Sequence, residues 1–390
     1  MVSMSRRARL VILFVSVPVV AFTMVGGFLG QSVGREDTYR HLRIFEDVVS
    51  LIGSNYVEEV DLEDVIEGSL RGLAGGLDSD STFLSADDVR RMESGEPLPN
   101  GEIGVEVTSQ YYLQVIAARP ESPASRAGLI PGDFIQAIDG QTTRRLSALE
   151  GNKRLRGKPG TSVKLSIIRG NQSEPSDLEL VRQRVTNRAV TTSLLDENFG
   201  YIRITRFSTG ASEELATAVA ELRDSGARAL LIDVRSAAGG SFEEGIAAAR
   251  LFVSSGTLLR RTEHGDRQVD VTATAGTEAV DMPLVLLTDF GTAHAAELFV
   301  AGLSGTSRAD TVGQRTAGRT SLQKLVKLSD GTGLWLSWAR YLQASGDPIH
   351  RSGIRPTVEV QVSVVQLGDP VPSGDEILEQ GLEHLRSTIL

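Results

Sequence analysis

Residues 289–303, DFGTAHAAELFVAGL, run from a turn of small residues into an apolar helix, with His294 between two alanines near the helix start. A turn between a strand and a helix is a place where hydrolases often present a nucleophile. The residue type expected there is serine or cysteine. His294 is therefore the first candidate for a functional side chain, and it raises the question of where a nucleophile lies.

The composition restricts which groups could carry out chemistry. The chain contains no cysteine, which excludes disulfides, thiolate metal sites and a cysteine nucleophile, and leaves oxygen, imidazole and amine groups. The five histidines form no HExxH motif or similarly close ligand pair, so we expect neither a metal site nor a cofactor. A net charge of -10 gives no electrostatic support for nucleic-acid binding.

The elements that must position these groups follow an apolar N-terminal run. Arg6, Arg7 and Arg9 precede an uncharged stretch at 10–30, which matches the roughly 20 residues that cross a bilayer as a helix. Arginines before the run, with no comparable cluster after it, predict a cytoplasmic N-terminus and an extracytoplasmic bulk. We expect residues 1–34 to be an uncleaved signal anchor, with a cleaved signal peptide as the alternative.

Residues 35–97 form an expected helical segment. The stretches EDTYRHLRIFEDVVSLIGSNYV and DLEDVIEGSLRGLAGGL place apolar residues at helical spacing, and Asp61 is a candidate N-cap of the second. The run LDSDSTFL at 77–84 interrupts this pattern with polar turn formers. The loop SGEPLPNGE then marks a domain boundary.

Residues 98–185 change to short strand-like pieces separated by turns: IGVEVT, YYLQVIAA, DFIQAIDG and SVKLSIIRG. The series SPASRAGLIPGD followed by FIQAIDG resembles that of PDZ domains in bacterial protease-associated proteins. The resemblance implies that a peptide C-terminus adds to a sheet edge while backbone N–H groups of a glycine-containing loop hold its carboxylate.

The candidate carboxylate loop is GEIGV, and it gives the expected peptide-binding residues Gly101, Ile103, Gly104 and Val105. The alternative is that its glycines only turn the chain into the domain. The helix that should line the groove, near SALEGNKRLRG, contains poor helix formers at Gly151 and Asn152, so we expect a short or altered groove.

Residues 186–367 alternate strand-like runs such as ARALLIDVR and PLVLLTD with helical runs such as SFEEGIAAARLFV. This alternation predicts an α/β fold with a largely parallel sheet and crossover helices. In such sheets the functional crevice lies beyond the C-terminal strand ends, so DVRSAAGG and TDFGTAH are expected to meet there. Residues 368–390 read as a final amphipathic helix.

Taken together, these segments resemble the C-terminal (tail-specific) processing peptidases, the S41 serine peptidases. The resemblance is carried by LLIDVRSAAGGSFEEGIAAARLFV, AHAAELFVAGL, VGQRTAGRTSLQ and ARYLQASGDPIHRSGIRPTVEV. It implies an α/β, S41 peptidase-type core with a parallel-rich sheet, an inserted β-rich PDZ domain, an N-terminal helical segment and an N-terminal membrane anchor.

The family's nucleophilic serine lies three residues before a helix glutamate, a later lysine acts as general base, and a glutamine orients the lysine. With Glu297 as the reference, an alignment without gaps places His294 at the serine position, Arg319 at the lysine position and Gln323 at the glutamine position. A Ser–Lys mechanism needs a hydroxyl and an amine that can lose its proton. A guanidinium, with a pKa above about 12, cannot serve as that base.

Gly239 and Gly240 match the glycine pair whose backbone N–H groups could stabilise an oxyanion; the alternative is a structural role at the helix entry. His294 alone reads as a polar surface residue. A sharper interpretation is that His294 and Arg319 grip a peptide carboxylate without cutting the peptide. A third is a relocated activity at another hydroxyl, with four candidates: Thr292, Ser304, Ser307 and Ser321.

We therefore expect a catalytically inactive S41 homologue that binds unstructured protein C-termini through its PDZ domain, as a regulator or adaptor in envelope proteolysis beside an active protease partner. The alternative is an active serine-type endopeptidase with a non-standard catalytic constellation; a purely structural envelope protein would bind no free C-termini. The resemblance also implies self-association. The expected location is at a membrane, with the bulk in the periplasm or at the cell exterior.

Overall fold

The computed structural model describes residues 40–172, 174–184, 189–274, 279–362, 367 and 374–389. The expected signal anchor at 1–34 lies outside these ranges. Within them, no helix has both the length and the apolar character that a membrane span requires. The chain forms two compact units, 1–72 and 73–390.

The N-terminal unit is helical over its described part. Residues 40–55 form one helix, and α2 (Leu62–Gly75) forms the next. The carboxylate of Asp61 accepts a hydrogen bond from the backbone N–H of Glu63 at 2.8 Å. Asp61 therefore caps α2, as the sequence predicts.

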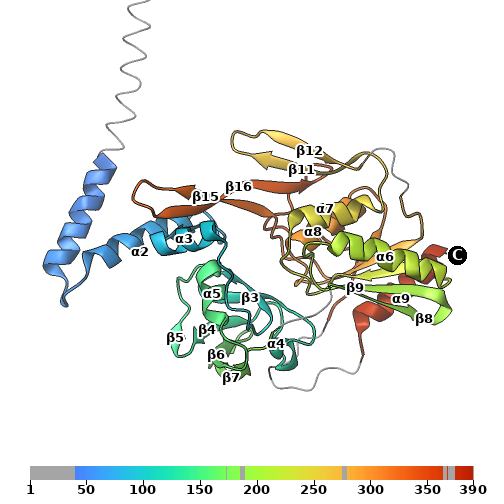
Figure 1. The fold of residues 1–390 in the computed structure, drawn as a ribbon, viewed down its shortest axis with the longest axis horizontal. Coiled ribbons are helices and arrows are strands. Elements are labelled where there is room, and N and C mark those ends of the chain that lie inside the picture. Colours follow the sequence, from blue (N-terminus) through green and yellow to red (C-terminus); the bar gives the residue numbers. More distant parts are fainter. Residues whose placement is uncertain are drawn as a thin grey trace, which may run out of the picture. The chain divides into compact units, whose positions relative to one another are not determined.

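A six-stranded sheet forms the centre of the C-terminal region, in the order β17-β14-β13-β10-β9-β8. Its strands β8 and β9 are labelled in Figure 1, near α6 and α9. Every neighbouring pair is parallel except β8 and β9. The predicted parallel-rich α/β sheet is therefore confirmed. Its strands are β8 (Val190–Leu195), β9 (Phe199–Ile204), β10 (Ala229–Asp233), β13 (Leu284–Thr288), β14 (Asp310–Gly313) and β17 (Val358–Glu359).

Helices cover both faces of this sheet. Leu230 and Ile232 of β10 pack with α6 (Ala211–Asp224), α7 (Phe242–Arg250) and α8 (Ala295–Ser304), whereas Leu231 faces α9 (Glu376–Ile389). Burial on both faces explains why β10 and β13 read as continuous apolar runs.

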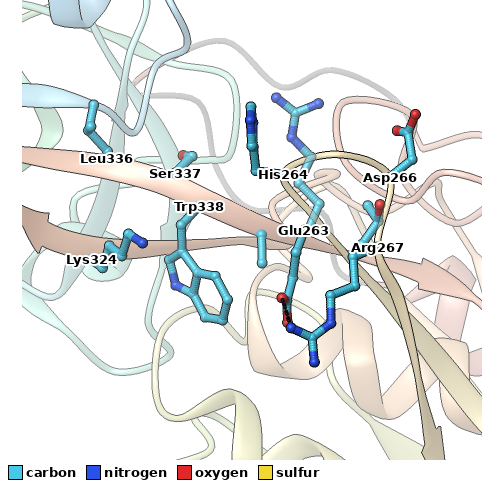
Figure 2. A pocket seen from close by; sticks show the side chains of 11 residues that line it. Glu263, His264, Asp266, Arg267, Lys324, Leu336, Ser337 and Trp338 are labelled. Atoms are coloured by element: carbon cyan, nitrogen blue, oxygen red, sulfur yellow. Dashed lines mark ion pairs between the residues drawn. The ribbon is translucent and has the colours of Figure 1, made fainter. Parts of the chain in front are cut away.

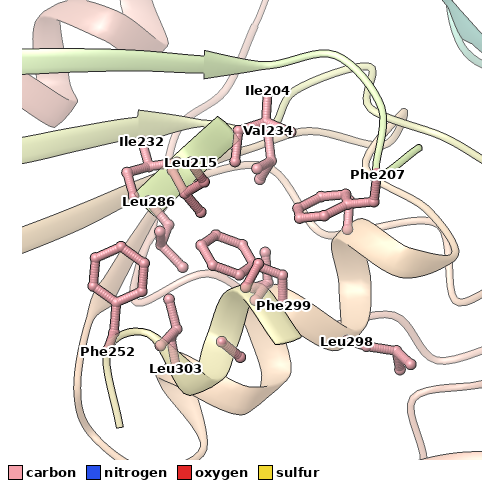
Figure 3. Packing of buried hydrophobic residues seen from close by; sticks show 14 of the residues in the cluster. Ile204, Phe207, Leu215, Ile232, Val234, Phe252, Leu286, Leu298, Phe299 and Leu303 are labelled. Atoms are coloured by element: carbon pink, nitrogen blue, oxygen red, sulfur yellow. The ribbon is translucent and has the colours of Figure 1, made fainter. Parts of the chain in front are cut away.

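Each face of this sheet has an apolar core, and the larger of these two cores centres on Phe299 of α8, which is fully buried (Figure 3). Its ring lies 5.5 Å from that of Phe207 and 6.1 Å from that of Phe252, measured between centroids. Such tilted and edge contacts are favourable for aromatic rings. The core therefore fixes α8 rigidly against the sheet, and with it the helix start where His294 lies.

A second sheet lies beside the first and is built around the long strand β16. Residues 82–84, expected as part of a polar turn, form a buried strand. It pairs antiparallel with β16, with Phe83 opposite Leu334. The local pattern missed this strand because its partner is distant in sequence. The sheet contains β1 (Thr82–Leu84), β11 (Thr257–Glu263), β12 (Gln268–Thr272), β15 (Ser321–Lys327) and β16 (Gly333–Gln343), and α3 (Ala86–Ser94) follows β1.

The expected β-rich domain at 98–185 has its own antiparallel sheet, in the order β2-β3-β4-β6-β7, with β5 beside β4. It also has its own apolar core. The elements are β2 (Val105–Ser109), β3 (Leu113–Ala118), α4 (Pro123–Arg126), β4 (Phe134–Ile138), β5 (Gln141–Thr142), α5 (Ala148–Leu155), β6 (Ser162–Ile168) and β7 (Ser176–Val181).

Helix α5 forms in spite of its poor helix formers. Ser147 and Glu150 make a reciprocal capping box at its start. A Cβ atom at Gly151 would lie 2.4 Å from a methyl carbon of Leu113 on β3. Gly151 therefore allows α5 to pack tightly on the sheet, which offsets its low helix propensity.

Candidate functional site

Three loops meet at the C-terminal ends of β10, β13 and β14. The N–H of Ala293 donates to the carbonyl of Ala237, and the N–H of Ala317 donates to the carbonyl of Thr292, both at 3.0 Å. The predicted meeting of DVRSAAGG with TDFGTAH is confirmed, and the loop that leads to Arg319 joins them.

His294 occupies the turn between β13 and α8 in a strained backbone conformation. It is the N-cap of α8, with φ 57° and ψ -120°, a backbone conformation that residues other than glycine rarely adopt. Its Nδ1 is buried and has no hydrogen-bond partner within the described chain. Burial, and secondly Arg319, lower the pKa of His294 to about 4, so the imidazole is neutral at pH 7.

Glu297, the reference residue of the sequence alignment, fastens the Arg319 loop to α8. Its fully buried carboxylate accepts hydrogen bonds from the hydroxyl of Thr316 at 2.5 Å and from the N–H groups of Gly318 and Arg319 at 2.6 Å. Burial raises the pKa of Glu297 to about 7. Glu297 therefore positions residue 319 relative to residue 294.

The guanidinium of Arg319 already has an internal carboxylate partner. One terminal nitrogen forms an ion pair with Asp80, and the other donates to the hydroxyl of Ser79 at 2.8 Å. The two charged side chains are only 12% and 13% exposed. A peptide carboxylate could be held bidentately by Arg319 only if it displaced Asp80.

Ser321 lies between Asp80 and a second histidine, which no sequence motif singled out. Its Oγ is 3.0 Å from an oxygen of Asp80 and 3.0 Å from Nδ1 of His350. Burial is the main cause that lowers the pKa of His350 to about 4. Because the ring is neutral, Nδ1–H can donate to Ser321 while Ser321 donates to Asp80.

The remaining hydroxyl candidates lack an imidazole partner in the described part of the chain. Thr292 is fully buried, and its hydroxyl donates to the carbonyl of Val234 at 2.9 Å and lies 3.2 Å from a carboxylate oxygen of Asp289. Ser304 donates to the carbonyl of Val300 within α8 at 2.9 Å. Ser307 has a positive φ of 55°. Of the four candidates, Ser321 is the one whose hydroxyl contacts an imidazole in the described part of the chain.

Gln323 is held beside the site by its own strand and by β16. Its side-chain amide donates to the carbonyl of Ser321 at 3.0 Å and to the hydroxyl of Ser337 at 3.3 Å. These bonds orient Gln323 along the sheet rather than toward the guanidinium of Arg319.

The glycine pair after β10 has positive φ angles, 79° at Gly239 and 89° at Gly240. A Cβ atom at Gly240 would lie 2.2 Å from the carbonyl oxygen of Phe207, so this position tolerates only glycine. At Gly239 the nearest atom to such a Cβ is a carboxylate oxygen of Glu106, 3.6 Å away. The close approach of Phe207 therefore requires glycine at 240, independently of any part in oxyanion binding.

The β-rich domain contacts the same loops. Ile116 and Ala117 of β3 form a small buried cluster with Ala238 and Ala293, and Ala317 packs against it. Each of the three site loops therefore contributes one alanine to this contact.

The proposed peptide-binding loop is tightly built. Gly101 and Gly157 exchange two backbone hydrogen bonds of 2.9 Å. Ile103 is buried in the core of the domain, and Val105 begins β2. Gly104 has φ 84°, and a Cβ there would lie 2.2 Å from Cβ of Ser122. Gly104 thus lets the loop pass close to α4.

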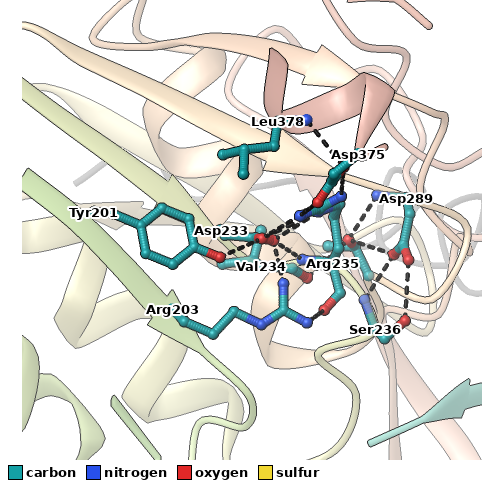
Figure 4. Close-up of polar contacts among 10 residues, drawn as sticks. Tyr201, Arg203, Asp233, Val234, Arg235, Ser236, Asp289, Asp375 and Leu378 are labelled. Atoms are coloured by element: carbon teal, nitrogen blue, oxygen red, sulfur yellow. Dashed lines mark hydrogen bonds and ion pairs between the residues drawn. The ribbon is translucent and has the colours of Figure 1, made fainter. Parts of the chain in front are cut away.

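A charge network around the buried Asp233 fixes the loop after β10 (Figure 4). Asp233 accepts hydrogen bonds from Tyr201, Arg203 and Arg235, and Arg235 also pairs with Asp375 at 2.6 Å. Burial alone would raise the pKa of Asp233, but the two arginines hold it below its usual value. The network ties the sheet end to the segment that enters α9.

One pocket of about 700 Å³ lies over β16 and the β11–β12 turn (Figure 2). Trp338 is its aromatic wall, with Arg261 5.3 Å and Lys324 5.6 Å from the ring centre. Ser337 belongs both to this pocket and to the hydrogen bond of Gln323, so the pocket borders the candidate site. No cluster of three or more potential metal ligands occurs in the described ranges.

Comparison with known proteins gives consistent matches. Residues 198–360 match the model of peptidase family S41, and residues 101–180 match that of the PDZ domain. The chain is 35% identical to the carboxyl-terminal-processing protease of Synechocystis sp. over 277 residues, 70% of this chain and 65% of that protein. It is 29% identical to the carboxy-terminal processing protease CtpA of Bacillus subtilis over 313 residues, 80% of this chain and 67% of that protein.

A solved structure agrees with these matches. The fold is similar to that of a photosystem II D1 C-terminal processing protease, with a TM-score of 0.69 and 26% identity, over 81% of this chain and 92% of that chain. The present chain spans about two thirds of the length of the curated relatives named above.

Proposed function

The chain belongs to peptidase family S41 and carries a PDZ domain, and from this premise we propose that it is a member that holds exposed protein C-termini without cleaving them. The named relatives are carboxyl-terminal processing proteases, which supports protein C-termini as the ligand class.

The ion pair between Arg319 and Asp80 carries the proposal. A general base must lose a proton near neutral pH, and a guanidinium does not. The guanidinium of Arg319 is paired with the carboxylate of Asp80. At the strained turn, His294 presents a neutral imidazole in place of a hydroxyl. Neither half of a hydroxyl–amine pair is therefore present at these positions.

The geometry of the PDZ domain supports the binding half of the proposal. A loop with glycines at 101 and 104 leads into β2, and α5 packs across the domain beside that strand. A peptide strand added along β2 would end at this loop, whose backbone N–H groups would meet its carboxylate. Gly101, Ile103, Gly104 and Val105 are the residues assigned to this contact.

The same proposal includes a place and a role. The protein acts as a regulator or adaptor in envelope proteolysis and delivers captured C-termini to an active protease partner. It also self-associates through its terminal helices. Residues 1–34 anchor it to the membrane with the bulk outside the cytoplasm, as the arginines before the apolar run favour.

Binding is tested with the full chain in mild detergent and a fluorescent peptide with an apolar C-terminus, by anisotropy. The free acid should bind at least about tenfold more tightly than the same peptide with a C-terminal amide, because the amide lacks the carboxylate charge. Gly104→Ala should weaken binding of the acid through the clash with Ser122. Gly140→Ala is the matched control, since Gly140 also has a positive φ but open space around it.

Equal binding of acid and amide would contradict C-terminal recognition. Cleavage is followed by intact-mass measurement of the same peptide in the same samples. The acid should stay intact in the presence of the native chain. Shortened products would contradict the non-cleaving role.

One observation favours the alternative of an active serine-type endopeptidase. Ser321 Oγ is 3.0 Å from His350 Nδ1, a distance suited to proton transfer. Ser321 is only 3% exposed, which argues against direct attack on a polypeptide. If the native chain cleaves and Ser321→Ala abolishes the cleavage, this alternative replaces the proposal; labelling by a fluorophosphonate probe would agree with it.

A further inference from the structure

We propose that Asp80 is a third residue that keeps the candidate site inactive, because its carboxylate would hold an amine at position 319 in the protonated form. Restoring a serine at 294 and a lysine at 319 would then not restore efficient cleavage while Asp80 remains. This inference deepens the proposed function and rests on it: Asp80 is assigned as a positioning residue for the charge at 319.

The position of Asp80 is built rather than incidental. The carboxylate of Asp78 accepts hydrogen bonds from the N–H groups of Asp80 at 3.0 Å and Ser81 at 2.7 Å, which shapes the turn before β1. One carboxylate oxygen of Asp80 pairs with Arg319, and the other lies 3.0 Å from the hydroxyl of Ser321. The turn at Asp78 and the hydroxyl of Ser321 therefore hold the carboxylate of Asp80 beside the end of the side chain at 319.

A lysine at 319 would meet the same carboxylate. Counted along the side chain, the amine nitrogen of lysine corresponds to the central carbon of the arginine guanidinium. Arg319 reaches Asp80 and Ser79 with the nitrogens bonded to that carbon. The backbone N–H of residue 319 is fixed by Glu297, so the introduced side chain would start from the same point.

The chemistry requires the opposite charge state. For cleavage, the serine oxygen bonds to the substrate carbonyl carbon while the serine proton passes to the unprotonated amine, which then protonates the departing amide nitrogen; water reverses the sequence to release the acid. A carboxylate within about 4–6 Å favours the protonated amine and raises its pKa by roughly 1 to 3 units. The amine would then be charged before the reaction begins.

The other groups that face position 319 do not replace this effect. His350 is neutral near pH 7, with its pKa lowered to about 4, and position 294 carries an uncharged serine once the nucleophile is restored. Glu297 has its pKa raised to about 7 by burial and binds backbone N–H groups rather than the guanidinium. Asp80 is therefore the side-chain carboxylate that contacts the charge at 319 within the described chain.

The test compares two variants of the full chain. One carries His294→Ser and Arg319→Lys; the other adds Asp80→Asn, which keeps the shape and removes the charge. The matched control adds Asp87→Asn instead, an exposed carboxylate on α3 that pairs with Arg90. All three have the same nucleophile and base, and the last two have the same net charge.

The first readout is the pKa of the introduced amine, measured by NMR of lysine labelled with ¹³C at Cε. Assignment is simple because the native sequence contains few lysines: Lys153, Lys158, Lys164, Lys324 and Lys327. Asp80→Asn should lower the pKa by roughly 1 to 3 units. Asp87→Asn should leave it unchanged. An amine pKa that is the same with Asp80 and with asparagine would overturn the proposal.

The second readout is cleavage of the apolar C-terminal peptide. A decrease of one pKa unit raises the unprotonated fraction about tenfold while the pKa is above the assay pH. The variant with Asp80→Asn should therefore cleave at least about tenfold faster than the variant that retains Asp80. Equal rates, with both variants active, would also overturn the proposal.

The two readouts separate this inference from the function on which it rests. If the amine pKa falls but no variant cleaves, the effect of Asp80 on the charge at 319 stands, and the claim that cleavage was lost through these positions fails. If the native chain itself cleaves, the non-cleaving function fails whatever the NMR result.

Discussion

The buried Glu297 gives a quantitative prediction through Glu297→Gln. The structure raises the pKa of Glu297 to about 7 from a usual value of 4.5, with burial as the main cause. The folded protein therefore binds more protons than the unfolded chain between about pH 4.5 and 7. Stability must then fall as pH rises through this window, because the native state gives up a proton that the unfolded state has already lost.

The size of the effect follows from the two pKa values. Protonation of Glu297 favours the native state by about 2.5 kcal/mol more at pH 5 than at pH 8, since a pKa difference of one between the folded and unfolded states corresponds to about 1.36 kcal/mol. Glutamine does not titrate. The difference in unfolding free energy between native chain and Glu297→Gln should therefore decrease by about 2.5 kcal/mol from pH 5 to pH 8.

The assay is urea unfolding at four pH values, followed by tryptophan fluorescence. Both tryptophans, Trp335 and Trp338, lie on β16, so the signal reports the sheet beside the candidate site. His294 and His350, whose pKa values are lowered to about 4, make stability fall as pH drops below about 6.5, which is the opposite sign. They occur in both proteins, so their contribution cancels in the difference.

A difference that stays constant within about 0.5 kcal/mol from pH 5 to pH 8 would refute the reasoning. It would mean that the three hydrogen bonds to Glu297 stabilise the carboxylate enough to keep it ionised throughout. Helix α8 would then hold the 316–319 loop through an ionised Glu297 rather than through a neutral one.

The remaining predictions concern stability. Phe299→Ala should lower the unfolding free energy by about 3 to 5 kcal/mol through the cavity it leaves, measured by urea unfolding; a loss below about 1 kcal/mol would contradict the packing described. Asp80→Asn in the presence of Arg319 should cost about 2 to 4 kcal/mol by leaving a mostly buried cation unpaired, whereas Asp87→Asn should change stability by less than about 0.5 kcal/mol. Gly240→Ala should lower the melting temperature in calorimetry, and an unchanged value would mean that the loop relaxes freely.

The sequence predicted the parts of the site that depend on local pattern. Alternating apolar runs and helices indicated a parallel sheet. The rule that crevices form at strand ends predicted that the turn containing His294 lies beside the turn containing Gly239. Both expectations hold in the structure, since the two loops are hydrogen bonded to each other.

The partners of Arg319 could not be predicted in the same way. Asp80 lies 239 residues before Arg319 in a run that reads as a polar turn, and its neighbouring strand β1 depends on pairing with β16. His350 reaches Ser321 from another loop. No local periodicity encodes such contacts. The burial of Arg319, which explains its need for a carboxylate partner, is visible only in the structure.

The contact between the β-rich domain and the site loops was also not predictable. Alanines at 238, 293 and 317 read as ordinary small residues, and only the tertiary structure shows that Ile116 and Ala117 pack against them. Small residues at loop ends carry little information on their own about what covers them.

The most direct test of the central claim is a time course of intact mass for an unstructured protein with a free apolar C-terminus. It is incubated with the native full chain and, in parallel, with the variant His294→Ser, Arg319→Lys, Asp80→Asn. We predict that the unstructured protein stays intact with the native chain and is shortened by the variant. Shortening by the native chain would contradict the claim that this member of the family holds C-termini without cutting them.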